Sequence, residues 1–161
     1  MNELTAEINL VAKQFADITD LDILVKQACG VIAQQDQLKT KPHGEFGLML
    51  CDDAKIQELN QQFRQKDQAT NVLSFPAQID DYDELFDNAE VYLGDIAMAF
   101  ESLQQEALSQ NKPIAEHFSH LLIHSILHLL GYDHIIATDA EHMESLEIKL
   151  LAMLDIENPY D

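Results

Sequence analysis

Cysteine is scarce in this sequence of 161 residues. The two cysteines, Cys29 and Cys51, lie far apart and form no CxxC motif. This spacing predicts neither a disulfide framework nor a thiolate metal site. Such a chain suits a reducing compartment, and we therefore expect a cytoplasmic protein.

Long apolar runs and a basic N-terminal segment are also missing. Runs such as residues 121–123 and 150–154 are far shorter than a membrane-spanning helix, which needs about 20 apolar residues. Glu3 and Glu7 stand where a secretory signal has basic residues followed by an unbroken apolar stretch. We therefore expect neither export nor a membrane location.

Basic residues are few, and arginine occurs only once, at Arg64. The chain has 9 Lys and Arg residues against 29 Asp and Glu residues, a formal net charge of -20. This charge opposes binding to nucleic acid or to an anionic membrane surface. The charged residues are distributed unevenly. Residues 39–66 hold five of the nine basic side chains, whereas every charged side chain in residues 80–90 is acidic. Both a local basic surface and two ordinary solvated segments fit this pattern.

The hydrophobic content of 47% predicts one domain over residues 1–161, with a buried core of its own. Apolar periodicity predicts about four strands and about five helices. Strand signals end before residue 100, which indicates an α+β fold with one small mixed sheet. The strands are expected at 7–12, 44–51, 71–75 and 91–99, and the helices at 20–32, 53–63, 100–110, 113–130 and 138–154.

Histidine is concentrated in one region, with six of the seven histidines between His117 and His142. In the helix predicted at residues 113–130, the helical period places His117, His124 and His128 on one face. The other faces are apolar nearly all round, so we expect this helix to be central and buried.

His124 and His128 have the spacing of two metal ligands on one helix, because side chains four residues apart are neighbours. Gly131 permits a left-handed turn that would bring His134 to the same point. Buried histidines satisfied by hydrogen bonds are the alternative, but each unpaired buried polar group is unfavourable by about 1 to 3 kcal/mol. The spacing therefore predicts a metal site in which three ligands leave one position for water.

The motif H-x-x-x-H-x-x-G-x-x-H is that of extended zinc proteases, except that Ser125 replaces the Glu that serves as general base. A metalloprotease is therefore an alternative function that this residue weakens. His120, Asp133 and Asp95 are candidates for orienting a ligand or acting as the general base, and the sequence does not decide among them.

Four segments resemble the YbeY family of bacterial rRNA-maturation endoribonucleases. The block HLLIHSILHLLGYDH at residues 120–134 resembles the signature of that family, and the segments at 59–76, 93–96 and 158–160 are also similar. Two residues differ from the usual family pattern, which has Gly in place of Ser125 and often Asp in place of Asn71. The hydroxyl of Ser125 is expected beside the metal, where it would narrow the cleft.

The resemblance implies a single YbeY-like metallohydrolase domain that cuts single-stranded RNA, matures the 3′ end of 16S rRNA and acts in ribosome quality control. It implies one Zn²⁺ per chain on His124, His128 and His134, although three imidazoles also accept nickel or another transition metal. Arg64 would be the functional cation of the cleft, where a guanidinium can hold phosphate oxygens.

The same resemblance implies rRNA and the small ribosomal subunit with its proteins as partners, with a ribosome-assembly GTPase as a further candidate. Lys39, Lys41 and Lys66 would add to RNA binding. A non-catalytic, zinc-containing ribosome-assembly factor is the second alternative, and the acidity of the chain favours it because RNA-binding enzymes are usually more basic.

Overall fold

The computed structural model describes residues 3–35, 38, 43–77 and 91–160. The predicted RNA-binding residues Lys39 and Lys41 lie outside these ranges. The described part contains a four-stranded sheet and five α-helices, which confirms the α+β prediction. In chain order the elements are β1 (Leu4–Leu10), the 3-10 helix η1 (Lys13–Asp17), α1 (Leu21–Ala33), β2 (Gly44–Cys51), α2 (Asp53–Arg64), β3 (Val72–Pro76), β4 (Tyr92–Ala99), α4 (Phe100–Ser109), α5 (Ile114–Leu129) and α6 (Ala137–Ala152).

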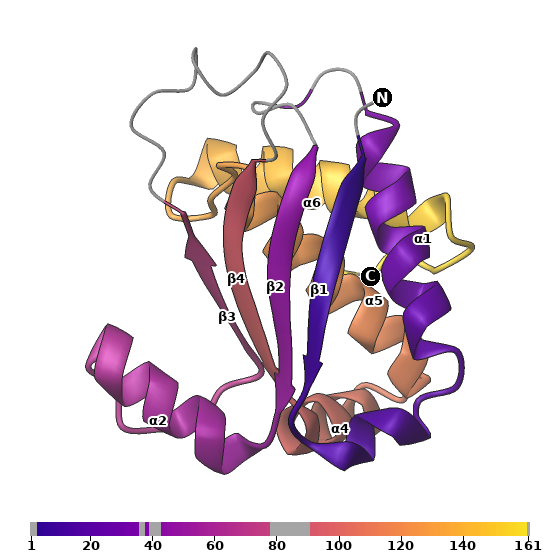
Figure 1. Cartoon of the computed structure of the whole chain (residues 1–161). Helices are drawn as coiled ribbons and strands as arrows, with labels where there is room; N and C mark the ends of the chain where they lie inside the picture. Colours follow the sequence, from indigo (N-terminus) through magenta and orange to yellow (C-terminus); the bar gives the residue numbers. More distant parts are fainter. Residues whose placement is uncertain (1–2, 36–37, 39–42, 78–90, 161) are drawn as a thin grey trace.

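The sheet is mixed, as predicted. Its strand order is β1-β2-β4-β3, and the first three strands are parallel while β3 runs antiparallel to β4. Figure 1 shows β3 at one edge of the sheet and β1 at the other. Because side chains alternate along a strand, each strand offers one set of residues to each face of the sheet.

One face of the sheet carries the main core. Phe46, Leu48 and Leu50 of β2 are buried here, and they belong to the same apolar cluster as Ile96 and Met98 of β4. The helices α1 and α5 pack on this side, and α6 packs against α5 (Figure 1). As expected, α5 is buried over most of its surface, because its apolar residues point in several directions.

The opposite face is covered only in part. The helix α2 packs there over a second, smaller cluster formed by Cys51, Ile56, Ala97 and Ala99. Asp52 caps α2, because its side chain accepts a hydrogen bond from the backbone N–H of Lys55 at 2.8 Å. The two faces of the sheet therefore have different surroundings.

The first strand begins and ends earlier than predicted. The structure places β1 at Leu4–Leu10, whereas the apolar alternation predicted residues 7–12. The backbone N–H groups of Val11 and Ala12 both donate to the carbonyl of Leu50, so the chain has already left the regular ladder there. Within the described residues, no helix combines the length and the apolar character that crossing a membrane demands.

Gly94 joins the edge strand β3 closely to β4, and its substitution is expected to loosen that edge. A Cβ added at Gly94, which has a φ of +131°, would lie 2.3 Å from the carbonyl oxygen of Phe75. We expect Gly94→Ala to lower the free energy of unfolding by about 1 to 3 kcal/mol, measured by urea denaturation. Gly30→Ala is the control, because a Cβ there meets nothing within 4 Å. Equal effects of the two substitutions would contradict this account of Gly94.

Candidate metal centre

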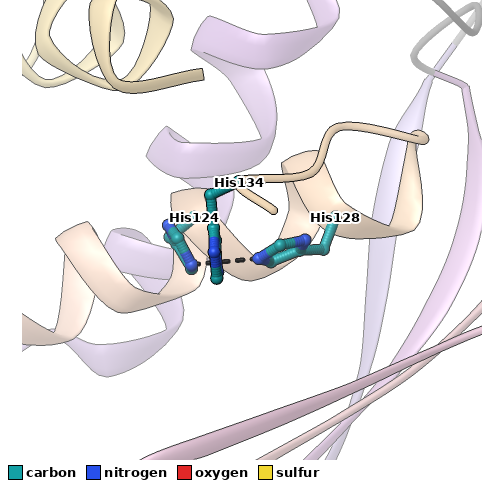
Figure 2. A group of neighbouring side chains, drawn as sticks. All are labelled: His124, His128 and His134. Carbon is teal, nitrogen blue, oxygen red and sulfur yellow. Dashed lines mark hydrogen bonds between the residues drawn. The ribbon is translucent and has the colours of Figure 1, made fainter. Parts of the chain in front are cut away.

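The structure brings together the three histidines predicted as metal ligands. His124 and His128 lie one turn apart on α5, and His134 reaches them from the segment after the helix, as Figure 2 shows. One ring nitrogen from each histidine lies within 4.8 Å of the other two. His124 and His128 are partly buried and His134 is exposed, so the group faces solvent on one side.

The turn after α5 has the geometry predicted from Gly131. Gly131 has a φ of +99°, in the left-handed region that favours glycine. The backbone N–H of Tyr132 then donates back to the carbonyl of Leu127 at 3.0 Å, which ends the helix. Asp133 accepts a hydrogen bond from the backbone N–H of His134 at 2.7 Å and so fixes the start of the returning segment.

Two ring nitrogens face each other in an arrangement that favours a cation between them. His128 Nδ1 lies 2.9 Å from the carbonyl oxygen of Tyr132, and His124 Nδ1 contacts the carboxylate of Glu147. Both partners accept hydrogen bonds, so both Nδ1 atoms carry the proton, and a neutral ring then has a lone pair on Nε2. The two Nε2 atoms are 3.0 Å apart (Figure 2). A metal ion would replace the repulsion between these lone pairs with two favourable bonds.

The electrostatics of His128 also suit a metal ligand. Burial, together with the neighbouring His124, lowers the pKa of His128 below its ordinary value. A lowered pKa favours the neutral ring, and only the neutral ring can bind a metal. The three histidines therefore form a group that could hold a metal ion, with the Nδ1 atoms of His124 and His128 directed away from it.

Glu147 of α6 contacts His124 on the side of the ring that points away from the candidate metal position. Its side chain is fully buried, and its carboxylate contacts His124 Nδ1 and accepts a hydrogen bond from the hydroxyl of Tyr160. Burial alone would raise its pKa, but the contacts from His120, His124 and Tyr160 lower the pKa of Glu147 to about 2. Glu147 is thus an ionised carboxylate that orients His124, an arrangement found behind many metal-bound histidines.

His120 belongs to this supporting network. Its Nε2 lies 3.6 Å from Glu147 Oε2 and 3.4 Å from the hydroxyl oxygen of Tyr160. Tyr160 comes from the C-terminal segment, and burial next to Glu147 raises its pKa. Of the two roles considered for His120, orienting the site agrees better with these contacts than acting as general base does.

A cleft of about 590 Å³ opens beside the three histidines. One wall is formed by β3 and the other by α5 and the segment that follows it. Asp133 is the only carboxylate among its described lining residues, so it is the acidic group best placed to meet a water molecule there. The lining residues are Arg64, Asn71, Val72, Leu73, Ser74, Pro76, His124, His128, Gly131, Tyr132, Asp133 and His134.

Arg64 reaches the cleft from the last residue of α2. Its Nη2 donates a hydrogen bond to the carbonyl of Ser74 at 2.7 Å, and its Cζ lies 5.2 Å from the centre of the Phe75 ring. These contacts hold the guanidinium across the edge strand β3. The remaining N–H groups can therefore bind an anion in the cleft without a large change of conformation.

A partly buried network of hydrogen bonds connects the start of β3 to α4 and α5. Asn71 donates to the carboxylate of Glu106 at 3.0 Å, and its side-chain oxygen accepts from the backbone N–H of Val72 at 2.7 Å. Glu106 also lies 2.8 Å from His117 Nε2. His117 thus faces α4 and stays outside the cleft, although it was predicted on the same helix face as His124. The family pattern often has Asp in place of Asn71. In this chain the neutral amide of Asn71 makes the hydrogen bonds to Glu106 and Val72.

Three residues named in the sequence analysis, Asp95, Ser125 and Lys66, are not among the residues that line the cleft. Asp95 lies on the opposite face of the sheet, where it accepts a hydrogen bond from Tyr92 and lines a separate hollow. It therefore cannot act as a general base at the histidines. Ser125 is fully buried and is absent from the lining residues, so its hydroxyl does not narrow the cleft. Lys66 is exposed beyond the end of α2 and is also not among the lining residues.

Sequence reasoning missed Glu147 and Tyr160 as parts of the site. A signal for Glu147 was present, because it shares its helix stripe with the buried Met143, Leu150 and Leu151. An acidic residue in an apolar stripe is buried, and a buried carboxylate needs partners. Nothing in the local sequence gave the identity of those partners, because His124 and Tyr160 lie in other segments.

Removing the charge of Glu147 is expected to weaken metal binding. The substitution Glu147→Gln leaves the size nearly unchanged but removes the ionised acceptor that holds the Nδ1 proton of His124. We expect the affinity for Zn²⁺ to fall about 10- to 100-fold, measured by competition with a chromogenic chelator. Glu141→Gln removes one charge from an exposed position of the same helix and serves as control. Unchanged affinity in Glu147→Gln would refute the orienting role.

Comparison with known proteins identifies the family. A family model described as Endoribonuclease YbeY matches residues 8–155. A protein of Paramagnetospirillum magneticum named Endoribonuclease YbeY is 51% identical over 117 residues, covering 72% of this chain and 71% of that protein. A protein of the same name from Rhizorhabdus wittichii is 44% identical over 158 residues, covering 91% of this chain and 90% of that protein.

A solved structure has the same fold. The solution structure of TM1509 from Thermotoga maritima superposes with a TM-score of 0.61 at 25% sequence identity, covering 91% of this chain and 86% of the other. The family match spans the end of β1, the other three strands, the histidine helix and all of α6, so it includes the cleft described above. The chain belongs to the YbeY family.

Proposed function

We propose that this protein is a metal-dependent endoribonuclease that cuts single-stranded RNA. The observation that carries the proposal is the position of Arg64 in the same cleft as His124, His128 and His134. A cation site and a guanidinium facing one cleft suit a substrate with a phosphodiester group. The name of the relatives, Endoribonuclease YbeY, supports the same reaction.

The residues of the cleft have separate roles in this proposal. A metal bound by the three histidines would lower the pKa of a water molecule and polarise a phosphoryl oxygen. Arg64 binds the phosphate and stabilises the negative charge that grows in the transition state. Asp133 is placed to accept a proton from the attacking water. Glu147 keeps the ring of His124 in one orientation throughout.

Zinc is the metal that we propose, at one ion per chain. Three imidazole nitrogens with one position left for water are the usual donor set of a catalytic zinc site. The same nitrogens also accept nickel and other transition metals, so the donor set favours zinc without excluding those. A metal content measurement decides between them.

In the cell, we propose a role in maturation of the 3′ end of 16S rRNA and in ribosome quality control, in the cytoplasm. The family supports this role, and the charge of the chain makes partners important. A net charge of -20 disfavours non-specific contact with RNA. The small ribosomal subunit with its proteins, and a ribosome-assembly GTPase, would therefore bring the enzyme to its substrate.

The two other functions fit the site less well. Peptide hydrolysis by the zinc-protease mechanism requires a glutamate at position 125, where this chain has a buried serine. A purely structural metal site is normally closed by four protein ligands. Here the described residues supply three clustered histidines at an open cleft, which favours a catalytic role.

The first experiment separates metal binding from catalysis. Zinc content is measured by mass spectrometry in the natural protein, in the double variant His124→Ala/His128→Ala and in Arg64→Ala. Each protein is then given labelled single-stranded RNA. We expect the double variant to lose zinc and cleavage together. We expect Arg64→Ala to keep zinc but to cut at least about 100-fold more slowly.

Lys55→Ala is the matched control for Arg64→Ala, because Lys55 is a basic residue of the same helix that lies outside the cleft. Zinc retained by the double variant would disprove the ligand assignment. No RNA cleavage by the natural zinc-loaded protein, together with tight binding to small ribosomal subunits, would favour the assembly factor. Cleavage of casein that stops with a chelator would favour the protease.

A further inference from the structure

Two aromatic rings lie directly beside Arg64, on the other side of β3. Phe63 precedes Arg64 on α2, and its ring meets that of Phe75 edge to face with 5.4 Å between centroids. Both rings line a hollow of about 730 Å³ that is separate from the histidine cleft. The mechanism proposed above does not use either ring.

Phe63 is unusually exposed for its position. Its exposed fraction is 54%, while Leu59, one turn earlier on α2, packs against the smaller apolar cluster. The exposed part of the ring adds nothing to the core, and it faces the hollow together with Phe75. Phe75 is partly buried beneath it and holds it from one side.

The aromatic pair is continuous with the histidine cleft through Arg64. Consecutive residues of β3 point to opposite faces, so Ser74 lines the histidine cleft and Phe75 lines the hollow. Arg64 bonds to the Ser74 carbonyl on one side and lies over the Phe75 ring on the other. A chain that crosses the edge of β3 at Arg64 would therefore meet both surfaces.

We propose that Phe63, backed by Phe75, is a stacking site for one base of single-stranded RNA, next to the phosphate that Arg64 holds. The proposal rests on the proposed endoribonuclease function. Bases stack on aromatic side chains whatever their sequence, and a neighbouring arginine binds the phosphate. Stacking would place the scissile phosphate relative to the metal and would require an unpaired base, which gives a physical basis for preferring single strands.

The charges around the hollow favour a base there and oppose a phosphate. Asp95 and Glu7 also line the hollow, and both are exposed acidic residues. They repel the sugar-phosphate chain but not an uncharged base. The backbone of the RNA would therefore stay at the rim with Arg64 while the base enters the hollow over Phe63. A nucleic acid fits this separation of charge better than an acidic peptide does.

The chain contains no tryptophan, so Phe63→Trp introduces a single fluorescent reporter at the proposed site. The zinc-loaded variant is titrated with a single-stranded oligoribonucleotide of about eight nucleotides, the size of site that such grooves occupy. We expect the tryptophan emission to be quenched by normal RNA and to change little with an abasic strand of the same length. Leu108→Trp, at an exposed position of α4, should show no quenching with either strand.

A second measurement uses the protein without a reporter. Phe63→Leu keeps an apolar side chain but removes the ring, and we expect its affinity for the normal strand to fall about tenfold. Its affinity for the abasic strand should equal that of the natural protein, and its zinc content should not change. Phe63→Trp should restore binding of the normal strand. A purely structural role of Phe63 would weaken binding of both strands alike.

The outcomes separate this proposal from the proposed function. If the natural protein cuts RNA and Phe63→Leu binds and cuts it equally well, the stacking site is wrong and the endoribonuclease stands. If the natural protein neither binds nor cuts RNA, both proposals fail. If Phe63→Leu binds RNA normally but no longer binds small ribosomal subunits, the aromatic pair contacts a protein, and the stacking site is again overturned.

Discussion

The close approach of His124 and His128 constrains the site more than any other interaction. Their Nε2 atoms are 3.0 Å apart while both Nδ1 atoms lie against acceptors, so two lone pairs face each other whenever both rings are neutral. A cation bound by the two Nε2 atoms would remove this repulsion. The acceptors come from the turn after α5 and from α6. Positioning one pair of rings thus requires the glycine turn and the packing of a second helix.

The direction of β3 places the other half of the site. The chain leaves β2 and forms α2 on the face of the sheet opposite α5. It then returns through β3 at the edge of the sheet (Figure 1). Because β3 is the last strand in the order β1-β2-β4-β3, no further strand covers its outer side within the described residues. Arg64 can therefore reach around the strand from α2 to the histidine cleft. The sheet separates an acidic hollow from the metal centre, and Arg64 lies where the two surfaces meet.

The sequence predicted local features of the site better than long-range ones. The spacing of His124 and His128 and the left-handed turn at Gly131 depend on the helical period and on one glycine, so they could be read directly. The partners of Glu147 depend on how α6 and the C-terminal segment fold back onto α5. The side of the sheet that Asp95 occupies depends on which face the helices cover and on the irregular pairing near Phe46. Neither property is encoded in nearby residues.

The acidity of the chain agrees with an RNA-cutting site that uses few positive charges. The described cleft has Arg64 as its only basic side chain besides the histidines, so charge neutralisation alone can supply only weak binding. The remaining affinity must come from contacts that do not depend on net charge, such as metal coordination and base stacking. Under the proposed function, such a site binds RNA only weakly through charge. Under the proposed function, that property protects other transcripts and leaves the choice of substrate to partners that present an unpaired strand.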